Sequence, residues 1–311
     1  MAFRSPGAKE KTFPFLLGNN WCKGQLFGNR NYGSALNCSN PHLFSYPGYS
    51  EMLVGFVDRR TKSNDKIENP NYTVLEFIND HQAFENKVAA FATWDVFPYI
   101  LREEKSGILV NAGREPVTGE LNEKEIMLNE LQELVRNSTS SRYDAFTFYL
   151  AMEYLDRERP KVLFISLDET DQHTHKGRYD EYLKSANRAD VKIAKLWSWI
   201  QSQPDYKDQT TLLITTDHGR GKGAKNGWKN HGRLAFGSSQ MWLAAIGPDT
   251  PDLGEIRFPH QVYQKQIAKT IAAFLGLNYV NEQPVGEAID ILFFTPELEA
   301  SLQEEVVWSD Q

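Results

Sequence analysis

Two short apolar runs, residues 161–167 and 211–216, constrain the fold most, because each ends in aspartate and histidine. Apolar residues recur at helical spacing over residues 182–200, and a third apolar run covers residues 241–246. Runs with so little alternation favour strands that are buried on both faces, as in a parallel sheet. A strand, a helix and a strand form a right-handed crossover, so we expect an α/β fold in which both polar ends meet at one sheet edge.

Five aspartates and histidines are predicted to converge at this edge. They are Asp171, His175, Asp217, His218 and His231. Carboxylate and imidazole ligands without thiolates suit Zn²⁺ or Mn²⁺ with open coordination positions. Each of these residues taken alone is better explained as a helix cap or a polar surface residue. The convergence of all five favours a metal centre.

Charge and hydropathy argue against two other classes of protein. A net charge of −7 and a pI near 5.6 argue against a general nucleic-acid binder. No apolar stretch approaches the roughly 20 residues of a membrane span. Residues 1–11 lack the apolar core of a signal peptide, so the localisation stays open, an exported or periplasmic parent protein included. Cys22 and Cys38 are too few for a disulfide framework, and whether they pair also stays open.

A second group of residues predicts a short helix that ends at Gly55 and has a serine at its start. Ser45 is followed by Pro47, which fits the first helical turn because that turn needs no N–H from it. Ser45 would then stand at a helix N-terminus, where free backbone N–H groups face an approaching anion. From the local sequence a plain N-cap is the better interpretation. The alternative is a nucleophile whose hydroxyl pKa is lowered by a metal ion.

Taken together, these motifs resemble the alkaline phosphatase superfamily, most closely in the style of its nucleotide pyrophosphatase/phosphodiesterase-like members. The resemblance implies a single domain over residues 1–311, a three-layer α/β/α fold with a mostly parallel central sheet. It also implies two divalent metals, zinc with manganese as the alternative. The motifs are Ser45-Tyr46-Pro47, Asp171-x-x-x-His175, Asp217-His218-Gly219 and Asn230-His231-Gly232. The family's roles make Ser45 the nucleophile, Asp171, His175 and His231 ligands of the first metal, and Asp217 and His218 ligands of the second.

In the family, one more aspartate of the second metal site ends the first strand, ahead of the nucleophile. Residues 1–44 contain no apolar run that ends in an acid. We therefore expect a chain that is short at its N-terminus, lacks the family's first strand and has an incomplete second metal site. Loss of a ligand should weaken that site and reduce activity.

The resemblance implies a metal-dependent hydrolase of small-molecule phosphate esters, with monoesters and diesters both open. Asn69, one of three asparagines at residues 64, 69 and 71, is an expected phosphate ligand. Arg220 and Lys222 are either substrate contacts or part of a solvated loop. Two other superfamily activities are less favoured. A sulfatase has an arginine in its motif where this chain has Tyr49. A phosphoglycerate mutase carries a large inserted domain between the nucleophile and the second metal cluster, and the residues between these motifs here are already used by the scaffold. A different class also stays open, a catalytically impaired relative that binds phosphorylated or anionic ligands.

Overall fold

Small and apolar residues place one strand at the centre of the first sheet. The computed structural model describes residues 14–16, 18, 24–135, 140–222 and 226–294. Strand β3 (Val88–Ala92) is buried along its whole length. It pairs in parallel with β4 (Leu109–Ala112) on one side and with β5 (Val162–Ser166) on the other, which gives the order β4-β3-β5.

The second sheet is of mixed direction. Its order is β6-β8-β1-β9, formed by β6 (Leu212–Thr215), β8 (Leu243–Ile246), β1 (Gly24–Phe27) and β9 (Gly254–Glu255). Strand β8 corresponds to the third predicted apolar run, and it runs antiparallel to both β6 and β1. Parallel neighbours need a long crossover, whereas the part of the β6–β8 connection that the structure describes holds only one 3₁₀ turn and the short β7.

Three further strands form a small sheet beside the second one. Its order is β10-β2-β7, with β10 (His260–Tyr263), β2 (Ser34–Asn37) and β7 (Gln240–Met241). The sequence pattern pointed to none of these short strands. After β10 the chain enters α10 (Ile267–Phe274).

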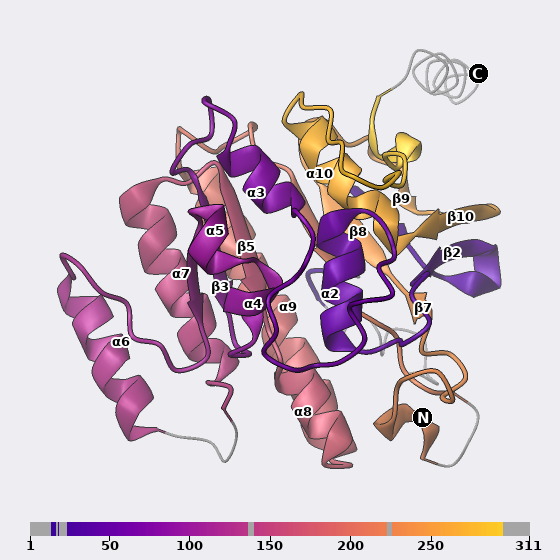
Figure 1. Cartoon of the computed structure of the whole chain (residues 1–311), viewed down its shortest axis with the longest axis horizontal. Helices are drawn as coiled ribbons and strands as arrows, with labels where there is room; N and C mark the ends of the chain where they lie inside the picture. The colour runs from indigo at the N-terminus through magenta and orange to yellow at the C-terminus, as the bar shows by residue number, and fades with distance from the viewer. Residues whose placement is uncertain (1–13, 17, 19–23, 136–139, 223–225, 295–311) are drawn as a thin grey trace.

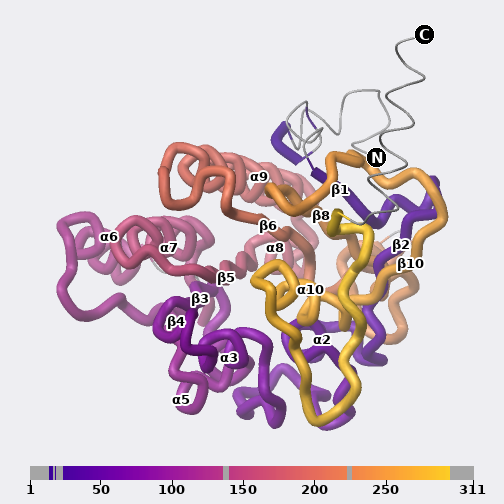
Figure 2. The backbone as a smooth tube through the Cα atoms, turned by 90° about the horizontal axis from the view of Figure 1, so that it is seen from above, coloured from indigo at the N-terminus to yellow at the C-terminus, as the bar shows by residue number. Residues whose placement is uncertain are grey.

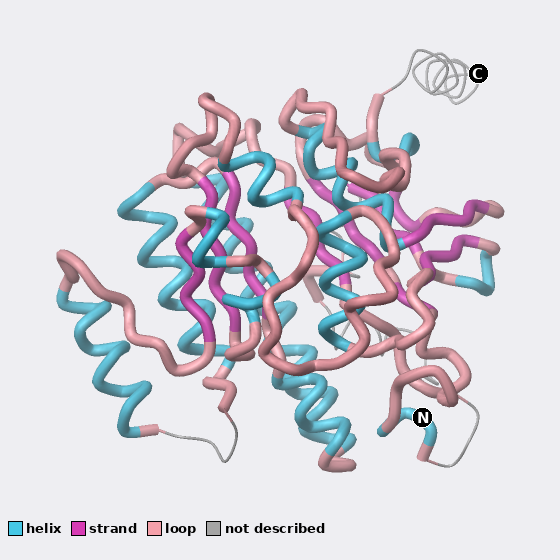
Figure 3. The backbone as a smooth tube through the Cα atoms, in the orientation of Figure 1, coloured by secondary structure: helices cyan, strands magenta, loops and turns pink. Residues whose placement is uncertain are grey.

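Helices cover both faces of the strands, so the fold is the expected three-layer α/β/α arrangement (Figures 1 and 2). One outer layer consists of α6 (Glu123–Leu134), α7 (Asp144–Glu158) and α9 (Tyr179–Ser202). The other consists of α2 (Ser45–Val54), α3 (Val74–Asn79), α4 (Phe97–Ile100), α5 (Glu103–Ser106) and α10. Figure 3 shows the strands between these two layers. No helix in the described part of the chain is both long and apolar enough to cross a membrane.

The predicted crossover connects the two sheets. From β5 the chain passes through α8 (Glu169–His175) and the long α9, whose apolar residues were predicted from their spacing, and enters β6. Strands β5 and β6 are not hydrogen-bonded neighbours, because β5 pairs with β3 and β6 pairs with β8. Their carboxyl ends nevertheless lie on the same side of the molecule, because Asp171 of α8, which follows β5, is 3.9 Å from His218, which follows β6.

Candidate active site and metal centre

Helix α8 presents two of the predicted ligands on one face. Asp171 and His175 are four residues apart, which is about one helical turn. The His175 Nε2 atom lies 3.1 Å from the Asp171 Oδ2 atom. The helix therefore places both side chains on one face, directed toward the same site.

A buried carboxylate, Asp144, holds the start of α8. Its Oδ1 atom accepts the backbone N–H of Asp168 at 2.8 Å and the Thr93 hydroxyl at 2.8 Å. Its Oδ2 atom accepts the backbone N–H of Glu169 at 3.2 Å. Burial, followed by the charge of Glu169, raises the pKa of Asp144 to about 7. Sequence reasoning missed this residue, because Asp144 begins α7 and reaches α8 only through the tertiary fold.

The other predicted pair lies in a tight turn at the end of β6. The backbone carbonyl of Asp217 accepts a hydrogen bond from the Gln264 side chain at 2.7 Å. A Cβ atom on Gly219 would lie 2.1 Å from the carbonyl oxygen of Gln240, so only glycine fits after His218. This close approach explains the glycine in the Asp-His-Gly motif.

The His218 ring is oriented by a backbone contact of one nitrogen, and its other nitrogen has no hydrogen-bond partner among the described residues. Its Nδ1 atom is 2.9 Å from the Gly219 carbonyl, a contact that requires a proton on Nδ1. The Nε2 atom is buried and has no hydrogen-bond partner among the described residues. It lies 3.5 Å from Asp217 Oδ2 and 3.9 Å from Asp171 Oδ1. A buried nitrogen that has no hydrogen-bond partner and lies near two carboxylates is the arrangement that a cation would satisfy.

His231 completes the cluster from the loop after β6. Its Nδ1 atom faces the Leu43 carbonyl at 3.2 Å, and its Nε2 atom lies 2.9 Å from the His175 Nε2 atom. Its ring stacks on that of His218, with centroids 4.1 Å apart. Burial, followed by the charges of neighbouring His218, Arg220 and His175, lowers the pKa of His231 to about 3, so the ring is neutral at pH 7.

These residues fit a divalent cation. Ligand atoms of Asp171, His218 and His231 all lie within 4.8 Å of one another. His175 and Asp217 adjoin them, so all five residues that the sequence analysis selected are brought together. The donor set contains oxygen and neutral nitrogen only, as zinc or manganese prefers when a site keeps open positions. Which metal each residue binds stays a prediction.

The two predicted cations of the loop after β6 have different surroundings. The Arg220 guanidinium contacts Asp171 Oδ1, and burial lowers the pKa of Arg220 to about 10. The Lys222 ammonium contacts the Gln240 side chain instead. Arg220 therefore lies at the Asp/His cluster, whereas Lys222 helps to hold the loop. Lys225 falls outside the described residues.

Ser45 is the first residue of α2, and residues on either side of it in the chain contact the cluster. Phe44, in an extended conformation, occupies the N-cap position, so Ser45 is not the cap. A Cβ atom on Gly48 would lie 2.3 Å from the Asp217 carbonyl oxygen, which means that the first turn of α2 packs directly on Asp217. On the other side, Leu43 contacts His231.

Of the asparagines considered as phosphate ligands, Asn64 is the one next to Ser45. Its Oδ1 atom accepts the backbone N–H of Tyr46 at 3.0 Å. Asn69, the asparagine selected from the sequence, is fully buried. Its side-chain amide donates to Ser50 Oγ at 3.3 Å and to the Ile100 carbonyl at 3.2 Å. These contacts hold the interior of the fold and leave Asn69 no surface for a substrate.

A second buried carboxylate supports the segment before the serine. Glu51 of α2 accepts the backbone N–H groups of Ser39 and Asn40 at 2.8 Å each. Asn40 in turn accepts the backbone N–H of Leu43 at 2.9 Å. Sequence reasoning missed Glu51, which it treated only as part of the helix. The thiol of Cys38, just before this segment, is buried and free, and Cys22 lies outside the described residues.

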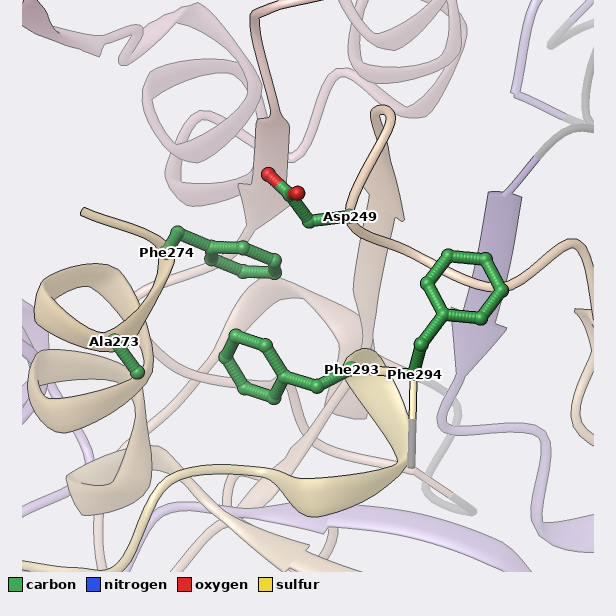
Figure 4. Close-up of a pocket in the computed structure, with 5 residues that line it drawn as sticks. All are labelled: Asp249, Ala273, Phe274, Phe293 and Phe294. Carbon is green, nitrogen blue, oxygen red and sulfur yellow. The ribbon is translucent and has the colours of Figure 1, made fainter. Parts of the chain in front are cut away.

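A cavity of about 240 Å³ lies away from this cluster, at the far ends of β8 and α10. Figure 4 shows Phe274, Phe293 and Phe294 around it, with Asp249 above. Leu212, the first residue of β6, pairs with Ile246 at the end of β8. The cavity is therefore at the sheet edge opposite the Asp/His cluster, and it contributes nothing to that site.

Comparisons with known proteins agree on the superfamily. Residues 52–234 match the family described as type I phosphodiesterase / nucleotide pyrophosphatase. No curated protein sequence matches the chain. The wild-type alkaline phosphatase PafA superposes with a TM-score of 0.66 at 10% identity, covering 91% of this chain and 95% of that one. A phosphonate monoester hydrolase from Silicibacter pomeroyi gives a TM-score of 0.53 at 13% identity, covering 87% and 69%. A 2-O GAG sulfatase gives 0.56 at 10% identity, covering 90% and 68%. At these identities the structural likeness establishes the fold.

Proposed function

Because the chain belongs to the type I phosphodiesterase / nucleotide pyrophosphatase family of the alkaline phosphatase superfamily, we propose that it hydrolyses phosphate esters with Ser45 as the nucleophile. The observation that carries this proposal is the packing of the first turn of α2 against Asp217, next to the free nitrogen of His218. This packing brings a serine at a helix N-terminus beside a group of residues that fits a divalent cation.

Ser45 would act in two displacements. Its hydroxyl oxygen bonds to phosphorus, the bond from phosphorus to the alcohol breaks, and the alcohol leaves with a proton. Water then cleaves the phosphoserine, which returns the proton to Ser45 and releases phosphate or, from a diester, a monoester. A divalent cation held by the Asp/His cluster would stabilise the negative charge that develops on the attacking and leaving oxygens.

One polar residue beside Ser45 is suited to orient the substrate, whereas the two cations of the loop after β6 already have other partners. We assign Asn64 to the phosphoryl group, because it lies at the N-terminus of α2. Arg220 contacts Asp171, so it balances the charge of this carboxylate and positions it. Lys222 is bound to Gln240 and would reach a phosphate only after leaving this partner.

Hydrolysis of p-nitrophenyl phosphate and of its bis-ester, measured with added zinc or manganese, tests this proposal. We expect metal-dependent turnover that falls by about 10³-fold or more in Ser45→Ala, as for other covalent nucleophiles. Ser202→Ala, on an exposed turn at the end of α9, is the matched control and should keep full activity. The preferred ester distinguishes a phosphatase from a diesterase, and turnover that survives in Ser45→Ala would exclude the mechanism.

Metal content is the second part of the proposal. One set of three mutually close ligand atoms, from Asp171, His218 and His231, occurs among the described residues. Asp217 and His218 would hold a second ion without a further carboxylate. We therefore expect about one tightly bound zinc per chain, and a weak second site that limits turnover. Two tightly bound zinc ions per chain, measured after extensive dialysis, would contradict this expectation.

A further inference from the structure

The cavity at the far ends of β8 and α10 has a lining that favours one kind of ligand. Five described residues line its volume of about 240 Å³: Asp249, Ala273, Phe274, Phe293 and Phe294. Three of these side chains are phenylalanine rings, one is a carboxylate and none is a cation (Figure 4). Cavities for drug-sized ligands have volumes of roughly 300–1,000 Å³, so this cavity admits a smaller organic molecule.

The phenylalanine rings lie on two sides of the cavity. Phe274 and Phe293 pack against each other, with ring centroids 4.5 Å apart and planes tilted by 36°. Both rings also pack on the main hydrophobic core, so this pair forms a fixed wall. Phe294 lies apart from the pair (Figure 4), and it is 48% exposed. A ring that is this exposed at a cavity has an aromatic face available for a ligand.

The two segments that form the walls are tied together by one buried side chain. Gln25 of β1 donates from its Nε2 atom to the Pro251 carbonyl at 3.2 Å and to the Ile291 carbonyl at 2.7 Å. Pro251 follows Asp249 by two residues, and Ile291 precedes Phe293 by two. The carboxylate and the aromatic wall are therefore held in place before a ligand binds, and binding does not have to order them.

Three features of the cavity attract a positive charge. Asp249 is exposed and forms no hydrogen bond or ion pair with the other described residues, so no described cation neutralises it. Ala273 and Phe274 end α10, and the C-terminus of a helix carries a partial negative charge. The face of a phenylalanine ring is negative as well, because of the quadrupole of the aromatic ring. The same three features repel an anion.

We propose that this cavity binds a small quaternary ammonium ion. A trimethylammonium group carries its charge on apolar methyl groups, so it can lie against phenylalanine rings without an unsatisfied N–H. A primary ammonium has three N–H donors, and among the described lining residues Asp249 supplies the one side-chain acceptor. A metal ion needs several oxygen or nitrogen ligands, which this lining does not offer.

This site is separate from the proposed active site. The cavity lies at the sheet edge opposite the Asp/His cluster, because Leu212 at the start of β6 pairs with Ile246 at the end of β8. The proposal therefore does not depend on hydrolysis by Ser45. It can be tested in the metal-free chain, where no turnover is needed as a readout.

Binding of choline to the full metal-free chain in EDTA tests the proposal. The matched ligand is 3,3-dimethylbutan-1-ol, which has the shape of choline with carbon in place of the charged nitrogen. We expect a Kd on the order of 1 mM for choline, and affinity at least about tenfold weaker for the alcohol, because it makes no cation–π or charge interaction. NMR titration of the Ala273 methyl group measures both affinities at the cavity itself.

Two variants should weaken the binding of choline, and a third should not. Asp249→Asn removes the charge at nearly constant size, and we expect a loss of about two- to fivefold, since water screens an exposed carboxylate. Phe294→Leu keeps an apolar side chain but removes an aromatic face, with an expected loss of about two- to fivefold. Asp252→Asn changes an exposed carboxylate that does not line the cavity, so it should bind choline as the parent chain does.

Four results would each overturn the proposal. Equal affinity for choline and the alcohol would show an apolar cavity with no preference for charge. Losses in Asp249→Asn and Phe294→Leu no larger than in Asp252→Asn would place choline elsewhere on the chain. The third result is no binding to the full chain at about 50 mM choline. The fourth is binding that appears only after deletion of residues 295–311, which would assign the cavity to the C-terminal residues of this chain.

Discussion

The two halves of the Asp/His cluster use the same residue types on different supports. Asp171 and His175 stand on α8, with 29% and 48% of their side chains exposed. Asp217 and His218 stand on a turn at the end of β6, with 18% and 3% exposed. The turn is fixed by close backbone contacts around Gly219, whereas α8 is held at its start by one carboxylate, Asp144. The Asp217/His218 pair is therefore held rigidly and shielded from solvent, whereas the Asp171/His175 pair is more exposed and less tightly held.

The largest expected effect is a difference in zinc affinity between two histidine variants. His218→Ala removes a nitrogen that is buried and has no hydrogen-bond partner among the described residues, so we expect zinc binding to weaken by more than about 100-fold. His175→Ala removes a nitrogen that is half exposed, and water can replace it, so we expect a loss of about tenfold. Isothermal titration with zinc measures both. His81→Ala changes an exposed histidine that is distant in sequence from the cluster, so it should bind zinc as the parent chain does. Equal losses of affinity in His218→Ala and His175→Ala would contradict the proposed difference between the two supports.

The support of α8 gives the next effect. Asp144→Asn places an amide N–H where the Oδ2 atom now accepts the backbone N–H of Glu169, so one hydrogen bond becomes a donor–donor contact. We expect zinc affinity to fall by about 10- to 100-fold, the usual range for a residue that orients ligands. The loss should be traced to Asp171 and His175 by a double-mutant cycle, in which Asp144→Asn and His175→Ala are not additive. Additive losses would show that Asp144 does not act through α8.

The support of β6 is tested by stability rather than affinity. Gly219→Ala brings a methyl group within 2.1 Å of the Gln240 carbonyl and 2.7 Å of the Gly237 carbonyl. The backbone must shift, and we expect a loss of about 1–3 kcal/mol in the free energy of unfolding by urea. Gly119→Ala is the comparison for backbone strain without a clash, because Gly119 has a positive φ and its Cβ atom would meet nothing within 4 Å. Gly219 is not among the residues with positive φ, so its loss reports the clash, and full stability in Gly219→Ala would contradict the steric explanation.

The elements predicted from sequence are those whose pattern is local. Helix α9 carries periodic apolar residues, and β5 and β6 are continuous apolar runs. The convergence of the Asp/His cluster was predicted from one rule, that the carboxyl ends of parallel strands meet at the ligand-binding edge of the sheet, without knowledge of any contact. These parts of the fold needed only the chain's own periodicity.

The missed elements depend on partners that are distant in sequence. Strand β1 pairs Gly24 with Ile246, and β2 pairs Leu36 with Met241, over more than 200 residues. Their own sequences are short and rich in small or polar residues, so they have no pattern of a strand before the partner is known. Asp144 and Glu51 were missed for the same reason, because each supports the site through backbone groups of another segment.

The smallest expected effects concern how the free energy of unfolding of the metal-free chain changes with pH. Asp144 and His231 should change it in opposite directions. Burial raises the pKa of Asp144 from 3.8 to about 7, so between these values the folded chain holds a proton that the unfolded chain has lost, and stability falls as pH rises. Burial lowers the pKa of His231 from 6.5 to about 3, so the unfolded chain holds the extra proton, and stability falls as pH falls.

Between about pH 4 and pH 6.5 the two slopes oppose each other, and single variants should separate them. Asp144→Asn should leave a stability that rises with pH, and His231→Asn one that falls with pH. Each change in slope is at most about 1.4 kcal/mol per pH unit, and it is smaller for His231 because water screens its partly exposed ring. Urea unfolding in EDTA at several pH values across this window measures both, and parallel curves for the two variants would show that neither group titrates as the structure implies.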